Sequence, residues 1–275
     1  MSSARAVAVV TGAGRFRGIG RACALRLAHD GFAVVVHART PEANEREAES
    51  GWRGAESVAA EIRDAGGKAT HVTGDLRDAS VRRSLVDATS ALGEASVLVN
   101  NAGTPGEANA HPVHETPESV WLDTIDVNLK TVYLMSCDFV PVLRDSKVDN
   151  KAIVNFSSTA GHRPLARYGA YCASKAAVEI LTAQQAIELA RHRIRVNCVA
   201  PGSTTTDMID GTLKRAAQYA KTTYDEIVNG VMKTIPMRRF AEPAEIANVV
   251  GFLSGTQSSF MTGQTLTVDG GMTLI

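Results

Sequence analysis

The sequence predicts a three-layer α/β/α fold, in which helices cover both faces of one doubly wound parallel sheet. Short apolar runs alternate with helical stretches along the 275 residues. Several runs are apolar at nearly every position, as in strands that a parallel sheet buries on both faces. No linker, repeat or low-complexity tract interrupts the alternation. We therefore expect a single domain over residues 1–275, with about seven strands.

Strand and helix patterns follow one another in a regular order. The strands are expected at residues 6–10, 33–36, 70–73, 97–99, 152–155, 195–199 and 265–268. After the first strand, Ile19, Cys23 and Leu27 recur at four-residue steps, which indicates a helix. A second helix is expected at residues 54–65. Because ligands of such sheets bind at the carboxyl ends of the strands, the functional residues should lie in the loops that follow them.

A glycine-rich segment joins the first strand to its helix and reads Thr11-Gly12-Ala13-Gly14-Arg15-Phe16-Arg17-Gly18-Ile19-Gly20. Glycines allow a tight turn and a close approach to a pyrophosphate, which the free N–H groups of the helix N-terminus can hold. The strict GxGxxG spacing is absent, because Arg17 occupies its last position when counted from Gly12. A glycine-rich turn without a ligand is the alternative.

Composition excludes several classes of function. The 29 basic and 29 acidic side chains cancel, which argues against nucleic acid or an anionic membrane surface as the main partner. No apolar run reaches the roughly 20 residues of a membrane span. The N-terminus enters an apolar strand at once without a signal-peptide cleavage pattern, so a cytoplasmic location is expected. The 4 cysteines lack CxxC spacing, so we expect neither disulfides nor a metal site.

Ser158, Tyr171 and Lys175 form a candidate catalytic centre. The four-residue step places Tyr171 and Lys175 on one face of a helix. A free phenol ionises near pH ~10, and a neighbouring ammonium would lower its pKa towards neutrality. A hydroxyl from another segment could then hold a substrate oxygen against the phenol, as in a carbonyl–alcohol redox centre. Tyr168 is a rival phenol without a lysine four residues on, and is better explained as a pocket wall. Ser157, next to Ser158, is expected to have a structural role.

Six motifs, in the family's own order, resemble those of the short-chain dehydrogenase/reductase family, whose fold is the Rossmann fold. They cover almost the whole chain and consist of Thr11, Gly12, Gly18 and Gly20; Asp75 and Leu76; the N-N-A-G at 100–103; Asn128 with Ser158, Tyr171 and Lys175; Pro201, Gly202 and Thr206; and residues 263–271. The glycine-rich loop departs from the family pattern by two extra residues, which leaves the route of the pyrophosphate loop open. The general look is that of 3-oxoacyl-thioester reductases.

The resemblance implies hydride transfer between a nicotinamide and a carbonyl or alcohol carbon. Tyr171 would be the general acid or base, Lys175 would lower its pKa and bind the ribose, and Ser158 would donate to the substrate oxygen. Asn128 would hold a water that relays protons from Lys175. The implied cofactor contacts are Gly12, Arg17, Gly18, Ile19, Gly20, Arg39, Asp75, Leu76, Asn101, Ala102, Gly103, Tyr171, Lys175, Pro201, Gly202, Thr204 and Thr206, and the substrate contacts are Ser158, Thr159, Tyr168, Tyr171 and Met208.

The residues after the second strand favour NADP(H) over NAD(H). A carboxylate there would bond the ribose 2′-hydroxyl and repel a 2′-phosphate. The family's acidic position resembles Ala38, which Arg39 follows, and Arg17 is a second candidate. A guanidinium binds phosphate in a bidentate, charge-assisted manner. If both arginines are simply solvated, use of NAD(H) stays open.

Two segments look longer than in the shorter members of the family. Residues 40–53 are polar and acid-rich, and we expect a solvated loop with a helical turn, with a cofactor role left open. Residues around 204–236 mix apolar side chains with cations, and we expect a substrate lid that excludes water. Packing of two helices onto the body is the alternative. The expected substrate is a medium-sized, partly apolar ketone.

Three further expectations rest on the resemblance. Family members commonly form tetramers, so a homotetramer or a dimer is expected. NAD-dependent oxidation of a secondary alcohol, such as a steroid, sugar or cyclic diol, is the first alternative activity. A nucleotide-sensing protein without turnover is an alternative of another class, although such a sensor would not need Asn128, Ser158, Tyr171 and Lys175 together.

Overall fold

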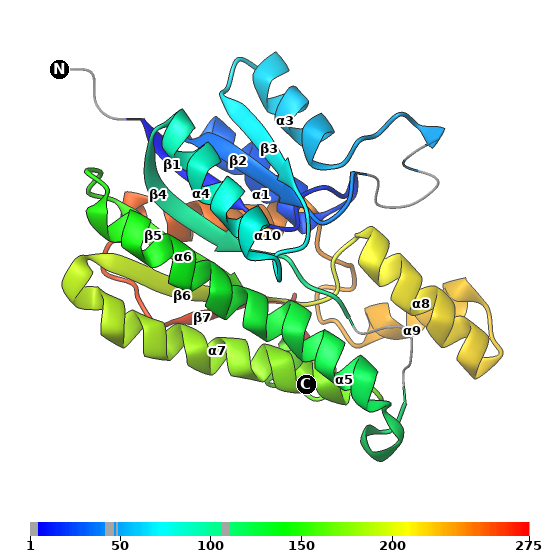
Figure 1. Ribbon diagram of the computed structural model, residues 1–275. Coiled ribbons are helices and arrows are strands. Elements are labelled where there is room, and N and C mark those ends of the chain that lie inside the picture. Colours follow the sequence, from blue (N-terminus) through cyan, green and yellow to red (C-terminus); the bar gives the residue numbers. More distant parts are fainter. Residues whose placement is uncertain (1–4, 42–46, 48, 106–110, 275) are drawn as a thin grey trace.

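The computed structural model describes residues 5–41, 47, 49–105 and 111–274 (Figure 1). Within these residues, seven strands form one parallel sheet in the order β3-β2-β1-β4-β5-β6-β7. The strands are β1 Ala6–Val10, β2 Ala33–Ala38, β3 Ala69–Thr73, β4 Glu94–Asn100, β5 Lys151–Phe156, β6 Ile194–Pro201 and β7 Thr265–Val268. The expected single-domain, doubly wound fold is confirmed. The strand order reverses between β1 and β4, which is where such sheets bind their ligands.

Helices cover both faces of the sheet, as Figure 1 shows. They are α1 Ile19–His29, α3 Ala55–Asp64, α4 Ala79–Leu92, α5 Glu118–Ile125, α6 Thr131–Asp145, α7 Gly169–Leu189, α8 Asp207–Ala220, α9 Tyr224–Lys233 and α10 Pro243–Ser254. The buried side chains of α1, α3 and α10 share one apolar cluster, and those of α4, α6 and α7 share another. The two clusters lie on opposite faces of the sheet and form the two halves of the core.

Alternation along the strands explains why both faces are apolar. Ala8 and Val10 of β1 belong to the cluster with α1 and α10, whereas Val7 and Val9 belong to the cluster with α6. Successive side chains of a strand point to opposite faces, so an unbroken apolar run fills both halves of the core. None of the helices in the described part of the chain is long and apolar enough to span a bilayer.

Segment 204–236 begins beside Ala241, a residue that follows it in the chain, and near its end Ile235 is buried against Gly270. Thr204 forms an isolated parallel bridge with Ala241, and Thr205 N donates to Ala241 O at 2.9 Å. Between these ends the chain forms α8 and α9, drawn in yellow and orange on one side of the molecule in Figure 1. Thr206 caps α8 by accepting from Ile209 N, and Thr223 and Glu226 form a capping box for α9.

Part of segment 40–53 is packed against the body. Glu47 is buried, and Trp52 is partly buried against the cluster that α1 and α3 share. Residues 42–46 and 48, which also belong to this segment, lie outside the described residues. The expectation of a solvated loop is therefore wrong for Glu47 and Trp52, because their side chains have partners in the glycine-rich loop.

Candidate active site

The glycine-rich loop and the N-N-A-G motif form one interlocked unit. Gly12 has a φ of +66°, and a Cβ atom on it would lie 2.6 Å from Ala102 Cα. Thr11 Oγ1 accepts from the backbone N–H groups of Asn101 and Ala102, both at 3.1 Å, and donates to Val99 O. Asn101 Nδ2 donates to the carbonyls of Thr11 and Gly12, both at 2.9 Å. The loops that follow β1 and β4 are thus held at contact distance.

His37, near the end of β2, joins this unit to the loop after β3. Its Nδ1 accepts from Gly12 N at 3.3 Å, and its Nε2 lies 2.9 Å from Gly74 O. Because a carbonyl can only accept, Nε2 carries the proton and the imidazole is neutral. Burial lowers the pKa of His37 to about 4. Sequence reasoning did not single out His37, and a polar residue inside an apolar strand was the available signal.

The longer glycine-rich loop packs against segment 40–53. Phe16 N donates to Glu47 Oε1 at 2.9 Å, and Trp52 Nε1 donates to Gly14 O at 2.7 Å. The rings of Phe16 and Trp52 meet edge to face at 5.0 Å. The Arg21 guanidinium lies 5.0 Å from the Phe16 ring centroid and 5.4 Å from that of Trp52. The added length of the loop is therefore fixed by aromatic and hydrogen-bond contacts.

A cavity of about 410 Å³ opens at the carboxyl ends of β1, β2, β3 and β4. Predicted cofactor residues that line it are Gly12, Arg17, Gly18, Ile19, Gly20, Arg39, Asp75, Leu76, Asn101, Ala102, Gly103 and Thr206, and Met208, a predicted substrate residue, joins them. The other lining residues, which the sequence analysis did not propose for the site, are Gly14, Arg15, His37, Ala38, Thr40, Thr104, Pro105, Val127, Thr131 and Asp207. The predicted residues outside the lining are Asn128, Ser158, Thr159, Tyr168, Tyr171, Lys175, Pro201, Gly202 and Thr204.

The glycine-rich wall of this cavity fits the pyrophosphate of a dinucleotide. Gly18 is the N-cap of α1 and makes no side-chain cap hydrogen bond, so the first N–H groups of the helix remain for an anion. A Cβ atom on Gly20 would lie 2.5 Å from Asn101 Nδ2 and 2.6 Å from Gly12 O. Only a backbone without side chains can therefore come this close at the loop, and a pyrophosphate needs the same approach.

Tyr171 and Lys175 lie one turn apart on α7, as their spacing predicts. Lys175 is buried, its Nζ donates to Phe156 O at 2.8 Å, and it lies 5.8 Å from the Tyr171 ring centroid. Burial lowers the pKa of Lys175 to about 8. The lysine therefore stays largely protonated at pH 7, with its charge beside the half-buried phenol.

Ser158 lies where β5 ends and caps a short 3₁₀ turn, Thr159–Gly161, by accepting from Ala160 N at 3.2 Å. This turn packs against α7. The neighbouring Ser157 is buried, and its single hydroxyl proton is shared between two acceptors, Glu179 Oε1 at 2.6 Å and Lys175 O at 3.0 Å. Ser157 therefore fixes the serine loop on the helix that carries the tyrosine and lysine, and the expected structural role of Ser157 is confirmed.

Asn128 is fully buried in a π-helical turn, Asp126–Lys130, between α5 and α6. Its Oδ1 accepts from Thr104 N at 2.7 Å, and its Nδ2 donates to Thr104 O at 2.8 Å and to Ser174 Oγ at 3.1 Å. A Cβ atom on Gly103 would lie 3.2 Å from Asn128 Oδ1 and 3.5 Å from Lys175 Nζ. The structure thus brings Asn128 and Lys175 close to Gly103, and Gly103 lines the cavity.

A buried polar chain beneath these residues was not found from the sequence. Asn100 Nδ2 donates to Asn155 Oδ1 at 2.9 Å, which joins the ends of β4 and β5. Asn155 Nδ2 in turn donates to Thr182 Oγ1 and Gln185 Oε1 of α7. These bonds hold α7 against the carboxyl ends of two strands, and so fix the positions of Tyr171 and Lys175.

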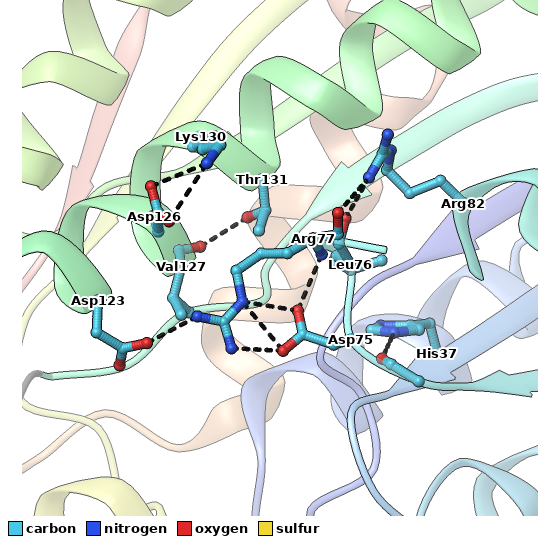
Figure 2. Close-up of polar contacts among 11 residues, drawn as sticks. His37, Asp75, Leu76, Arg77, Arg82, Asp123, Asp126, Val127, Lys130 and Thr131 are labelled. Atoms are coloured by element: carbon cyan, nitrogen blue, oxygen red, sulfur yellow. Dashed lines mark hydrogen bonds and ion pairs between the residues drawn. The ribbon is translucent and has the colours of Figure 1, made fainter. Parts of the chain in front are cut away.

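The loop after β3, which contains the predicted adenine contact Asp75, is held by two arginines (Figure 2). Arg77 binds both carboxylate oxygens of Asp75, at 2.6 Å for Oδ2 and 3.0 Å for Oδ1, and also reaches Asp123 Oδ1 of α5 at 2.8 Å. Hydrogen bonds from Arg77 lower the pKa of Asp75. Arg82 donates to Leu76 O and to Asp138 of α6. Asp75 is therefore an ionised carboxylate at the cavity wall.

A family model described as enoyl-(acyl carrier protein) reductase matches residues 12–273. A 3-oxoacyl-[acyl-carrier-protein] reductase of Staphylococcus aureus is 35% identical over 266 residues, which cover 96% of this chain and 97% of that protein. An Aspergillus oryzae protein named short chain dehydrogenase/reductase is 34% identical and covers 98% of this chain. The chain belongs to the short-chain dehydrogenase/reductase family.

Solved structures agree with this assignment. The actinorhodin polyketide ketoreductase with NADPH superposes with a TM-score of 0.84 at 30% identity, over 98% of this chain and 97% of that one. A Burkholderia xenovorans protein described as a short-chain dehydrogenase/reductase gives a TM-score of 0.85 at 31% identity, over 98% and 97%. The expected class, an oxidoreductase of the short-chain dehydrogenase/reductase family that acts on carbonyl and hydroxyl groups, is confirmed.

The two arginines that the sequence proposes for a 2′-phosphate have different surroundings in this short-chain dehydrogenase/reductase. Arg39 is exposed at the end of β2 and lines the cavity beside Ala38. Arg17 also lines the cavity, but its Nη1 forms an ion pair with Asp210 of α8 at 2.9 Å. Among the described residues, no three His, Cys, Asp or Glu side chains gather as metal ligands would.

Proposed function

We propose that the chain is an NADP(H)-dependent reductase of ketones, or a dehydrogenase of the corresponding secondary alcohols, with 3-oxoacyl thioesters as one substrate class to test. The observation that carries the proposal is the buried Lys175 ammonium 5.8 Å from the Tyr171 ring, next to a cavity that fits a dinucleotide. When bound, the nicotinamide would supply the hydride in ketone reduction and accept it in alcohol oxidation. The protein's own residues must supply the proton and hold the substrate oxygen.

Tyr171 is the proposed proton donor for ketone reduction and the proton acceptor for alcohol oxidation. The Lys175 charge stabilises its phenolate, since an ammonium near a phenol favours the ionised form. Ser158 donates to the substrate oxygen as negative charge develops there. Asn128 holds the loop at Thr104 and, we propose, a water that links Lys175 to solvent.

The proposed preference for NADP(H) rests on the end of β2. Ala38 stands where a carboxylate would select the 2′-hydroxyl of NAD, and Arg39 follows at the cavity wall. A guanidinium in this place favours a phosphate. The similar ketoreductase structure contains NADPH, which supports the proposal. We also propose that Pro201, Gly202 and Thr204, which lie at the end of β6 outside the cavity lining, contact the nicotinamide half.

We propose that residues 204–236, called the lid from here on, cover the substrate. Thr206, Asp207 and Met208 at the start of α8 line the nucleotide cavity, so the lid begins beside the cofactor. Met208 is 45% exposed, and Tyr168, just before α7, is half-buried. Together with Thr159 they form the proposed walls for a medium-sized, partly apolar ketone.

Loss of NADPH and NADH absorbance across a panel of ketones, including 3-oxoacyl thioesters, tests this function. We expect turnover, with a lower KM for NADPH than for NADH, and a decrease in kcat/KM of about 10²–10⁴-fold for Tyr171→Phe. Arg39→Asp should abolish the preference for NADPH. Unchanged thermal unfolding of Tyr171→Phe serves as its folding control. Nucleotide binding without turnover would favour the sensor, and better use of NADH by the unmodified protein would reject the cofactor proposal.

We also propose an oligomeric state and a cellular location for the protein. Tyr133 of α6 and Ile180 and Ile187 of α7 are large, exposed apolar side chains on neighbouring helices. We propose that these side chains are buried in a homotetramer or a dimer, because monomeric proteins rarely expose several large apolar side chains close together. Light scattering after gel filtration measures the mass directly. The 4 cysteines are free thiols, which supports the proposed cytoplasmic location.

A further inference from the structure

The glycine-rich loop contacts the lid through Arg17 at two points. Arg17 Nη1 lies 2.9 Å from Asp210 Oδ2, on the first turn of α8, with the side chains 45% and 29% exposed. Asp207 N donates to Arg17 O at 3.3 Å. Tyr224 of α9 donates its hydroxyl to Asp210 Oδ1 at 3.0 Å. Asp210 therefore joins one residue of the loop to both helices of the lid, and we call this set the loop–lid contact.

The loop side of this contact is fixed by other bonds. Phe16, directly before Arg17, donates its N–H to Glu47 and packs against Trp52. Arg21 Nη1 donates to Phe16 O at 3.1 Å, and Arg21 is held by both carboxylate oxygens of Glu61. A rigid loop can position what it binds, whereas a mobile loop would move with the lid.

The lid side of the contact forms a wall of the nucleotide cavity. Thr206 and Asp207, at the start of α8, line the same cavity as Gly12 and Gly18 of the loop. The ion pair crosses between these two walls. Arg17 therefore sets the position of the first turn of α8 beside a nucleotide that binds the loop.

We propose that Arg17 is a lid-positioning residue: it holds the first turn of α8 on the glycine-rich loop, so that cofactor binding and lid closure are coupled. The 2′-phosphate selectivity is left to Arg39. This inference rests on the proposed function in one respect, since it takes residues 204–236 to be the lid. It also gives the longer loop a role, because the loop brings the Arg17 side chain to α8.

The exposure of Arg17 and Asp210 sets the size of the effect expected when their ion pair is lost. Exposed ion pairs contribute little, and hydrogen bonds to charged groups contribute more. Loss of the loop–lid contact should therefore weaken the closed lid by about three- to tenfold. A lost contact to a 2′-phosphate would instead change the ratio of the NADPH and NADH dissociation constants.

Steady-state kinetics separate these two roles. Arg17→Gln and Asp210→Asn should each raise the KM for the carbonyl substrate about three- to tenfold, with the NADPH-to-NADH preference unchanged. The double variant should be no worse than either single variant, because both remove one contact. The charge-reversed pair, Arg17→Asp with Asp210→Arg, should recover part of the loss. Arg39→Gln should give the opposite result, a changed preference with an unchanged substrate KM.

Hydrogen exchange of residues 207–220, measured with and without NADPH, gives a readout that needs no turnover. NADPH should slow exchange in α8 of the unmodified protein, and Arg17→Gln should reduce this slowing. Asp225→Asn, which removes an exposed carboxylate of α9 that is not part of the loop–lid contact, is the matched control and should behave as the unmodified protein. If no carbonyl compound is turned over, the proposed function fails and the exchange experiment still decides the contact. The proposal would be overturned if NADPH slowed exchange in α8 of Arg17→Gln as much as in the unmodified protein. A loss of NADPH preference in that variant would overturn it as well.

Discussion

Lys175 is buried, and its ammonium donates to Phe156 O at 2.8 Å, close to the Tyr171 ring. The spacing of Tyr171 and Lys175 predicted that they share one face of a helix, because spacing on a helix is a local property. It could not predict the burial of Lys175 or its lowered pKa, since β5 and the loop at Gly103 surround it through the fold. Pairing along a helix was predictable, and pairing across the molecule was not.

His37 shows the same limit at the nucleotide end of the site. The sequence places it directly after the strand expected at residues 33–36, but its partners, Gly12 and Gly74, come from two other loops. Only the neutral ring can accept from Gly12 N while it donates to Gly74 O. Its pKa, about 4 in the folded protein against about 6.5 when unfolded, therefore follows from burial.

This difference makes stability depend on pH. Between pH 6.5 and about 4 the unfolded chain binds a proton that folded His37 does not, so the free energy of unfolding falls as the pH falls. We expect His37 to account for a loss of about 2 kcal/mol between pH 7 and pH 5. Urea unfolding at both values checks this against His37→Asn, which should lose less on acidification. An equal loss in the two proteins would contradict the role of His37.

At the scale of elements, α5 and α6 hold the loop after β3 in place. Arg77 joins Asp75 to Asp123 of α5, and Arg82 donates to Leu76 O (Figure 2). Arg82 also donates to Asp138 of α6. The strands themselves were predictable, because their apolar runs set the boundaries to within a few residues. The two arginine contacts to α5 and α6 were not predictable, since they join residues 46 and 56 positions apart in the sequence. The π-helical turn at Asn128 was not predicted either.

Arg77 should therefore affect cofactor binding through Asp75. Arg77→Gln removes two exposed ion pairs and frees the carboxylate that faces the cavity. We expect weaker NADPH binding, with a dissociation constant raised about fivefold, and little change in kcat at saturation. NADPH fluorescence titration measures it, with Arg83→Gln, an exposed arginine of α4, as the control. Tighter binding by Arg77→Gln would show instead that Arg77 competes with the nucleotide for Asp75.

At the scale of the whole molecule, the two departures from the shorter family pattern meet each other. The longer glycine-rich loop contributes Phe16, and segment 40–53 contributes Trp52 and Glu47. Each departure was visible in the sequence, but their contact was not, because chain length alone does not tell which segments pack together. The three layers and the parallel sheet were predictable from the alternation of strands and helices, since that alternation is repeated along the chain.

Trp52 should stabilise the molecule through this contact. Trp52→Phe keeps an aromatic ring and loses the hydrogen bond to Gly14 O, which should lower the free energy of unfolding by about 1 kcal/mol. Trp52→Ala also removes the ring from beside Phe16 and Arg21, and should cost about 3 kcal/mol, at the lower end for a buried aromatic. Urea unfolding at pH 7 orders the three proteins. Equal stabilities of Trp52→Ala and the unmodified protein would show that the segment contributes nothing to the fold.

The bridge between Thr204 and Ala241 has a consequence for how such enzymes diversify. This bridge joins the two ends of the excursion that carries α8 and α9, so the length and content of the excursion can change while the sheet keeps its register. Grafts exchanged between these two points give a direct route to new substrate ranges in the laboratory. Natural insertions at the same place would be tolerated for the same geometrical reason.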